Sequence, residues 1–455
     1  MNVLFLKHGA VLLRKQGFIA FESYNYRMNG VAFYIENSGL TQCDFRDPLN
    51  GNPGAGATEF MTILVASELS KRDMNVFLLS TSPGKFPTSI KTFQVNNLEE
   101  AFDYSVQNQL ILIIRASVFG FESTLAKIAK YKNLTIVVWA HLTPNQNSLK
   151  IISNTPQIKA VVCLENNQRV RMGDSLARSK LLTIPYGITG STDLVDVSGN
   201  SNNVAFTGAL VPQKGFHLLA DAWPRVTNLI PDAKLYVFGS GRLYDSRVEL
   251  GSQGISTEEY EKRIFKELGR DDESVLFLGN ADSKSRNTIF DSCKLGIVNP
   301  SAKTETFCLS AVEFQQRGIP VIGGRRYGLL DTVRHRKTGF LVLNTSNLHR
   351  HIIRLLSNNQ KLGNFGQQAQ AYVLAKYELE DKIEKWHLLL ENLLSKPAIT
   401  VSGLTEDMRI RSLQGVFVWV NRPLVSLTNG NWPTGVAMWE FLKQMKRKLV
   451  SFQVR

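Results

Sequence analysis

Short apolar runs alternate with amphipathic stretches along most of the chain. A run at Val31–Glu36 is followed by a glycine-rich segment, Gly51 to Ala57, and then by helical periodicity from Thr58 to Arg72. Four further runs are rich in Val, Ile and Leu: Asn75–Ser80, Gln109–Ile114, Leu134–Ala140 and Ile158–Leu164. Strands buried on both faces have this composition, and their alternation with helices is typical of a parallel sheet covered by helices.

The alternation is interrupted once, around Tyr186–Asn203, where Gly, Ser and Asn replace the periodic pattern. A second series of elements follows. Its predicted strands are Asn203–Thr207, Lys234–Gly239, Ser274–Leu278, Lys294–Asn299 and Ile319–Gly323, and its predicted helices include Phe216–Thr227 and Cys308–Arg317. We therefore expect an α/β protein with two Rossmann-like domains facing a central cleft, where ligands bind at the carboxyl ends of the strands.

This pattern divides the chain into six segments. Residues 31–190 and 203–377 form the two Rossmann-like domains, joined by a linker at 191–202, and one long helix at 378–397 closes the fold. An extension at 1–30 and a tail at 398–455 stand outside the alternation, and the sequence assigns them no role. The tail contains three Trp residues and the basic stretch Lys443-Gln-Met-Lys-Arg-Lys448.

The charge of the chain favours anionic partners. Its 455 residues carry a formal net charge of +14, and its pI is about 9.5. Nucleic acid, lipid headgroups and phosphorylated small molecules all meet this condition. No zinc-finger spacing and no RNA-binding aromatic signature is present, so we expect no nucleic-acid partner.

The cysteines and the hydropathy indicate the compartment. Cys43, Cys163, Cys293 and Cys308 lie far apart with no C-x-x-C pair, which argues against a metal cluster and favours a reducing cytoplasmic environment. No apolar run reaches the ~18 residues that a membrane span needs. We expect a soluble or peripherally attached protein.

The stretch Thr304-Glu-Thr-Phe-Cys-Leu-Ser-Ala-Val-Glu313 carries the most informative chemistry. A helix that begins near Phe307 has unpaired amide groups in its first turn, and these favour a diphosphate. Glu305 would lie at the helix entrance, near sugar hydroxyls, and Glu313 would reach a ribose diol nearly two turns along. The alternative is an ordinary helix with a solvated Glu at each end, since two Glu at this spacing are common.

This stretch resembles the Glu–x7–Glu motif of the family 4 retaining glycosyltransferases, which have the GT-B fold. Five other segments resemble family motifs and occur in the family's order: Gly51-Asn-Pro-Gly-Ala-Gly-Ala-Thr-Glu59, Asn203-Val-Ala-Phe-Thr-Gly-Ala-Leu-Val-Pro-Gln-Lys-Gly-Phe-His217, Pro231-Asp-Ala-Lys-Leu-Tyr-Val-Phe-Gly-Ser-Gly241, Tyr327-Gly-Leu-Leu-Asp331 and Lys337-Thr-Gly-Phe-Leu341. The resemblance covers about residues 31–395, and the residues of these motifs are most similar to those of bacterial surface-polysaccharide enzymes. Single motifs of this kind are weak, whereas six in order are specific.

The resemblance implies the donor site in the second domain. Lys214 would bind the donor diphosphate, as a Lys beside a loop glycine can. The donor-binding residues would be Gly208, Lys214, Glu305, Thr306, Phe307, Cys308, Leu309 and Glu313. Many family members have an Arg where this sequence has Ala209, so one phosphate contact is missing or comes from elsewhere.

The resemblance also implies an acceptor side in the first domain. Gly54, Gly56 and Ala57 would form a loop that lets backbone approach the acceptor or a phosphate closely. Ala57 replaces a glycine that is usual in the family. His141, at the end of a predicted strand, would lie near the donor sugar, although a lone His is more often structural. Lys214, Glu305 and His141 would be the catalytic residues.

The implied reaction is hexosyl transfer from a nucleotide-diphosphate sugar to a glycan or lipid-linked acceptor. The leaving diphosphate would take the acceptor proton, with retention at the anomeric carbon, and Glu305 would orient the sugar rather than act as a nucleophile. Neither a cofactor nor a metal ion is expected, and closure of the domains would exclude water. The tail fits peripheral contact with anionic lipid, or a final helix packed on the first domain with a solvated basic face, and we favour the second.

Three alternatives remain at this point. A phosphorylase-like enzyme of similar fold would need a pyridoxal lysine and a much longer chain. A nucleotide-sugar epimerase shares the two-domain fold and would turn over a donor without an acceptor product. A non-catalytic scaffold in a polysaccharide assembly complex is suggested by Ala209, whereas Lys214, Glu305 and Glu313 argue against it.

Overall fold

The structure is a computed structural model of the chain. It describes residues 4–5, 11–15, 18–21, 28–116, 120–190, 192–195, 201–241, 250–269, 272–395 and 413–452. Much of the predicted linker (191 and 196–200), the end of the predicted closing helix and residues 398–412 of the tail lie outside this part, as does most of the extension at 1–30. Three short strands of that extension, β1 (Leu4–Phe5), β2 (Val11–Lys15) and β3 (Phe18–Phe21), form an antiparallel sheet.

The first domain is built on a seven-stranded parallel sheet in the order β10-β9-β8-β7-β4-β5-β6. Its strands are β4 (Gly30–Ile35), β5 (Val76–Ser80), β6 (Lys91–Gln94), β7 (Leu110–Arg115), β8 (Thr135–Ala140), β9 (Ile158–Cys163) and β10 (Leu181–Thr183). Five of these match the predicted strands. The sequence pattern missed the two edge strands, because β6 is wholly exposed and polar and β10 has only three residues.

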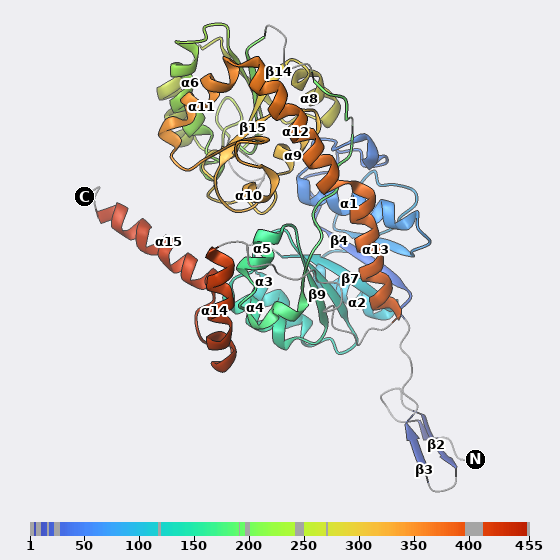
Figure 1. Cartoon of the computed structure of the whole chain (residues 1–455). Coiled ribbons are helices and arrows are strands. Elements are labelled where there is room, and N and C mark those ends of the chain that lie inside the picture. Colours follow the sequence, from blue (N-terminus) through green and yellow to red (C-terminus); the bar gives the residue numbers. More distant parts are fainter. Residues whose placement is uncertain are drawn as a thin grey trace.

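The second domain is built on a six-stranded parallel sheet in the order β13-β12-β11-β14-β15-β16. Its strands are β11 (Asn203–Thr207), β12 (Lys234–Phe238), β13 (Val275–Gly279), β14 (Cys293–Val298), β15 (Val321–Gly324) and β16 (Gly339–Val342). Only the short edge strand β16 was not predicted. Two parallel sheets covered by helices confirm the predicted α/β class (Figure 1).

Helices cover both faces of each sheet. In the first domain, β4 directs Phe33 toward a core shared with α1 (Ala57–Ser70) and directs Ala32 toward a core shared with the helices of the opposite face. The remaining helices of this domain are α2 (Leu98–Gln107), α3 (Phe121–Ile128), α4 (Gln146–Asn154) and α5 (Asn166–Arg171). Those of the second domain are α6 (Phe216–Thr227), α7 (Glu258–Leu268), α8 (Ser283–Phe290), α9 (Leu309–Gln316), α10 (Leu329–Thr332) and α11 (Leu348–Leu356).

Two consecutive helices cross from the second domain back to the first. α12 (Asn359–Tyr377) runs along the second domain, and α13 (Leu379–Ser395) then packs against the first (Figure 1). Trp386 of α13 is 1% exposed, and its ring lies edge-on 6.4 Å from that of Phe33. The sequence predicted one long helix from Glu378, which corresponds to α13. The apolar periodicity on which that prediction rested is explained by the burial of one face of α13 in the core.

The two domains also contact each other directly. The amide of Asn52 donates to Ser283 Oγ (2.9 Å), and the amide of Ser283 donates to the Asn52 carbonyl (2.8 Å). A cavity of about 480 Å³ lies beside this contact. Its lining is Asp44, Arg46, Asp47 and Asn50–Pro53 of the first domain and Asp282–Lys284 of the second. The loop that precedes α1 therefore touches the start of α8.

The last described segment is a pair of helices, α14 (Leu413–Leu427) and α15 (Gly435–Phe452). α14 and the first turn of α15 pack on the first domain, and Trp439 in the next turn contacts Tyr327 of the second domain, whereas the part of α15 after Trp439 extends away from both domains (Figure 1). The favoured expectation of a final helix packed on the first domain is therefore wrong for the part of α15 after Trp439. No helix in the described part of the chain is both long and apolar enough to span a membrane.

Candidate functional site

A buried ion pair forms the centre of the site in the second domain. Lys214 Nζ lies 2.8 Å from Glu305 Oε2, and the two side chains are only 13% and 8% exposed. Gly215 has a left-handed φ of +75°, and a Cβ there would lie 2.7 Å from the Ser301 backbone nitrogen. Glycine is thus required after Lys214, and this close approach brings the lysine loop against the loop that carries Glu305.

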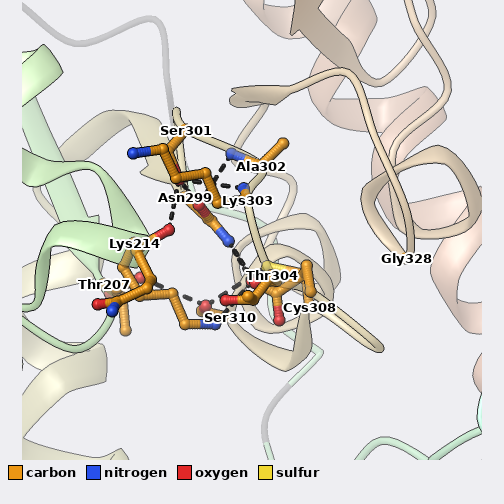
Figure 2. Close-up of polar contacts among 12 residues, drawn as sticks. Thr207, Lys214, Asn299, Ser301, Ala302, Lys303, Thr304, Cys308, Ser310 and Gly328 are labelled. Atoms are coloured by element: carbon orange, nitrogen blue, oxygen red, sulfur yellow. Dashed lines mark hydrogen bonds and ion pairs between the residues drawn. The ribbon is translucent and has the colours of Figure 1, made fainter. Parts of the chain in front are cut away.

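Asn299 donates to the same oxygen of the Glu305 carboxylate that Lys214 contacts. Asn299 ends the β14 strand run, and its Nδ2 donates to Glu305 Oε2 (2.8 Å) and to the Thr304 carbonyl (2.9 Å). Ser301 Oγ donates in turn to Asn299 Oδ1 (2.9 Å). Figure 2 shows the Lys214 and Asn299 side chains directed toward the segment that begins at Thr304, with Ser301 on the far side of Asn299. The sequence analysis assigned Asn299 only to a strand; its position at the carboxyl end of a buried strand was the available signal.

Helix α9 begins one residue after the start of the predicted helix Cys308–Arg317 and two residues after Phe307, where the phosphate-binding argument placed it. Its first residue is Leu309, and Cys308 occupies the N-cap position, whereas the sequence suggested a start near Phe307. Helix geometry gives the amides of Leu309 and Ser310, just after the Glu305 loop, no partner within α9, whereas the amide of Ala311 donates to the Cys308 carbonyl at 3.1 Å. Burial raises the pKa of the Cys308 thiol to about 12, so this residue is a neutral thiol at the helix entrance.

Glu313 is held by an ion pair that the sequence did not predict. Arg286 of α8 places its guanidinium 2.6 Å from Glu313 Oε1, and the side chains are 10% and 20% exposed. The pair joins α8 to α9 on the same side of the sheet. Arg286 also lies three residues after Ser283, which contacts the first domain, so this pair is close to the domain boundary.

The loop after β11 contains Gly208 and Ala209. The amide of Gly208 donates to the Phe238 carbonyl at 3.0 Å, which ties this loop to the end of β12. Ala209 is 2% exposed, so its methyl group is part of the core. Ser310 Oγ donates to the Thr207 carbonyl at 3.4 Å, which places the start of α9 against this loop.

In the first domain, Asn52 shapes the glycine-rich loop. Its Oδ1 accepts the amides of Gly54 (3.0 Å) and Ala55 (2.8 Å), and its Nδ2 donates to the Ala55 carbonyl (2.9 Å). Gly56 is the N-cap of α1, and Ala57 is the first residue of that helix. The predicted loop therefore exists as a turn ordered by Asn52, which the sequence analysis did not single out.

His141 lies at the end of β8 and is buried, with 9% of its surface exposed. Its Nδ1 lies 2.6 Å from Tyr186 Oη, and the Tyr186 ring packs edge-on against Phe307 at 4.9 Å. Burial, reinforced by the charge of Arg115, lowers the pKa of His141 to about 3. His141 is therefore neutral at physiological pH, and Tyr186 connects it to the loop of the second domain that carries Glu305.

A small cavity adjoins His141 in the first domain. Its lining includes Thr58, Glu59 and Arg115, and the Arg115 guanidinium bridges Glu59 and Glu36 at 2.7 Å each. Burial raises the pKa of Glu59 above its usual range. The sequence analysis did not identify these charges as partners, because they come from three separate elements.

The predicted residues thus form two groups. Lys214 and Glu305 meet in a direct contact, and Thr306, Phe307, Cys308 and Leu309 continue that loop into α9. His141 meets this group only through Tyr186, and Gly54, Gly56 and Ala57 lie at the start of α1. The described residues contain no group of three or more His, Cys, Asp or Glu side chains placed to hold a metal ion.

The second domain matches a family model. Residues 195–372, which include Lys214, Asn299, Glu305 and Glu313, match the model described as glycosyl transferases group 1. The match contains the whole six-stranded sheet and ends within α12.

Three known proteins are similar over larger parts of the chain. A lipopolysaccharide 1,2-N-acetylglucosaminetransferase of Salmonella typhimurium is 24% identical over 208 residues, 44% of this chain and about half (51%) of that protein. An uncharacterized glycosyltransferase of Haemophilus influenzae is 22% identical over 80% of this chain and its own full length (100%). The structure of a sucrose-phosphate synthase from Thermosynechococcus elongatus matches with a TM-score of 0.63 at 15% identity, over 80% of this chain and 99% of that one.

Proposed function

From a second domain that belongs to the glycosyl transferases group 1 family and a chain that has the GT-B fold, we propose that this protein transfers a sugar from a nucleotide-diphosphate sugar to a glycan or lipid-linked acceptor. Polysaccharide biosynthesis is the process in which we place it. The similarity to a lipopolysaccharide glycosyltransferase supports this assignment.

The buried Lys214–Glu305 pair is the observation that carries the proposal. An ammonium group has three donors, so one lysine can contact a carboxylate and a phosphate oxygen at the same time, and Lys214 is held at Glu305. The amides at the start of α9 add partial positive charge beside it. Charge that accumulates on the leaving diphosphate would therefore be stabilised by groups that are already in position.

We infer retention of configuration at the anomeric carbon of a hexosyl donor. In this route the diphosphate oxygen takes the acceptor proton on the same face from which it departs. Glu305, fixed by Lys214 and Asn299, would accept hydrogen bonds from the donor sugar and orient it. The neutral His141 would offer a hydrogen bond without adding charge near the sugar.

We propose that no metal ion takes part. Lys214 and the first turn of α9 supply the positive charge that a divalent cation would otherwise provide. Arg286 forms an ion pair with Glu313 and so fixes the carboxylate that we assign to the ribose diol.

The compartment that we propose is the cytoplasm, with peripheral attachment at a membrane surface. Four free cysteines, three of them buried, agree with a reducing environment. The apolar surface of the α14–α15 segment supports the attachment and is developed in the next subsection.

The test combines donor turnover with product analysis. The full chain is incubated with UDP, GDP and ADP sugars, with and without a lipid-linked glycan extract, and released nucleoside diphosphate and sugar transferred are both measured. We expect one donor to give acceptor-dependent transfer, and NMR of the product to show a retained anomeric configuration. Altered sugar without transfer would indicate an epimerase, and no donor binding would indicate a scaffold, which Ala209 favours.

A further inference from the structure

The helical pair α14–α15, which we call the C-terminal hairpin (residues 413–452), carries most of the exposed apolar surface of the described chain. Of 21 large hydrophobic side chains that are exposed in that part, 12 lie between Val416 and Met445. Soluble proteins rarely expose contiguous apolar patches of more than a few hundred Å², and larger ones mark contact with another protein or with a membrane. The hairpin therefore presents a surface suited to a partner.

Helix α14 is apolar on two opposite sides. Val418 and Val425 face the first domain and are 2% and 0% exposed. Val416, Val420 and Leu427 fall on the opposite side of the helix by its 3.6-residue period, and they are 47%, 58% and 84% exposed. Burial against the first domain accounts for only one of these two faces.

Helix α15 has an apolar stripe that nothing in the described chain covers. Met438, Phe441, Leu442 and Met445 follow the spacing i, i+3, i+4 and i+7 and are 39%, 61%, 55% and 46% exposed. In Figure 1 the part of this helix that follows its contacts at Gly435 and Trp439 extends away from both domains. The periodicity is that of a helix whose apolar face is meant to be buried.

The charge and aromatic content of the hairpin indicate the partner. Its sequence contains five basic residues and one acidic residue, with four of the basic residues between Lys443 and Lys448. Trp419, Trp432 and Trp439 are 59%, 43% and 42% exposed. An apolar stripe with Trp and with Lys or Arg on the same helix is the pattern of helices that lie in a membrane interface. A second copy of this basic chain, at +14, would be repelled.

We propose that the C-terminal hairpin docks on an anionic lipid surface through the outer face of α14 and the stripe of α15. The proposal deepens the proposed function, because a lipid-linked acceptor would be presented at that surface. Apolar side chains would enter the interface while the basic positions meet lipid headgroups.

The base of the hairpin is fixed to the first domain and reaches the donor loop. The buried Asp174 accepts Asn421 Nδ2 and the amide of Gly435, both at 2.7 Å. Trp439 Nε1 donates to Tyr327 Oη at 2.7 Å, and the amide of Gly328 donates to the Glu305 carbonyl at 3.0 Å. A docked hairpin would thus hold the donor loop next to the lipid surface.

The test is sedimentation of the full chain with vesicles. Vesicles of phosphatidylcholine alone are compared with vesicles that also contain phosphatidylglycerol, at low and high salt. We expect binding to the anionic vesicles that weakens with salt. The double variant Phe441→Ser/Leu442→Ser should bind at least about tenfold more weakly, since two large apolar side chains no longer enter the interface. Leu229→Ser, at a residue 67% exposed outside the hairpin, is the matched control.

Equal loss in the control, or no binding of the wild type to either vesicle, would overturn the proposal. Lipid-free self-association that the double variant abolishes would assign the stripe to a second copy and would also overturn it. Folding of the variant is checked by circular dichroism. Nucleotide binding is measured without vesicles, so failure of the donor site is seen independently of lipid docking.

Discussion

The two domains differ in the charge state of their predicted catalytic residues. The second domain buries two ion pairs, Lys214–Glu305 and Arg286–Glu313. In the first domain, His141 and Tyr186 form a hydrogen-bonded pair in which burial lowers the histidine pKa to about 3 and raises that of the tyrosine. The ion pairs of the second domain are thus charged, whereas the His141–Tyr186 pair of the first domain is neutral.

This difference indicates where the diphosphate and the sugar of the donor are expected to bind. Buried ion pairs are expensive to desolvate and are weak evidence for stability, so their retention suggests a role in binding a charged ligand. A diphosphate needs positive charge, which the second domain supplies. A sugar hydroxyl needs neutral hydrogen-bonding groups, which His141 and Tyr186 provide.

The largest effect is expected when the charge of the second domain is removed. Lys214→Ala should reduce kcat/KM for sugar transfer by about 10²–10³, the range seen when one preorganised electrostatic group is lost. The measurement is steady-state transfer at several donor concentrations. Lys303→Ala removes an exposed lysine from the neighbouring loop and should change kcat/KM less than about threefold. Equal losses in both variants would contradict a specific role for Lys214.

Glu305→Gln sharpens the comparison by keeping shape and removing charge. The amide still accepts from Asn299, but Lys214 loses its ionic partner. We expect kcat to fall about 10- to 100-fold, with a smaller change in donor KM, if the carboxylate orients the sugar in the transition state. A change confined to donor KM would assign Glu305 to ground-state binding instead.

The second ion pair should have a smaller effect. Arg286→Ala leaves Glu313 without its partner at 2.6 Å, so the carboxylate is no longer fixed on α9. We expect donor KM to rise about tenfold with kcat little changed. Arg286→Lys keeps the charge but not the planar guanidinium group, so its donor KM should lie between that of the wild type and that of Arg286→Ala. An unchanged donor KM in both variants would show that Glu313 does not contribute to donor binding.

The neutral pair predicts a pH dependence of stability. His141 has a folded pKa of about 3, below its ordinary value near 6.5, so the unfolded chain binds one more proton in this window. The free energy of unfolding should therefore decrease as pH falls from about 6.5 toward 3, by up to about 1.4 kcal/mol per pH unit from this residue.

Urea unfolding at several pH values measures this slope. His141→Phe should show a shallower slope over the same range, because the titrating group is absent. Leu229→Ser, at an exposed position that carries no titrating group, is the control and should keep the wild-type slope. An unchanged slope in His141→Phe would show that His141 is not buried in its neutral form.

The smallest expected effect concerns metal ions. If Lys214 and the start of α9 supply the positive charge, removal of divalent cations with EDTA should leave the transfer rate within about twofold of the untreated rate. Loss of activity that Mg²⁺ or Mn²⁺ restores would instead assign the diphosphate charge to a metal ion.

The sequence predicted the regular interior of the fold better than its edges. Apolar runs located β4 and β8 because strands buried on both faces are continuous in hydrophobicity. The exposed strand β6 and the short strand β16 lack that signal. The start of α9 was predicted one to two residues early, at Phe307 or Cys308, since the loop that precedes the helix is buried and apolar at Phe307.

The candidate site was predicted in its members but not in its contacts. Lys214 and Glu305 were recognised by their motifs, yet nothing in a linear pattern showed that they pair at 2.8 Å. Asn299 and Arg286 were not identified as site residues. Asn299 lies 6 positions before its partner Glu305, and Arg286 lies 27 positions before its partner Glu313, so neither pairing is visible in a local pattern. Such partners depend on how strand ends meet, which hydropathy does not encode.

The most direct measurement of the central claim is calorimetric titration of nucleoside diphosphates into the wild type, Lys214→Ala and Lys303→Ala. We expect one diphosphate to bind the wild type and Lys303→Ala alike, and to bind Lys214→Ala at least about tenfold more weakly, because a charge-assisted phosphate contact is lost. Binding of equal strength in Lys214→Ala, or no binding of any diphosphate to the wild type, would contradict the assignment of the donor site to the Lys214–Glu305 pair.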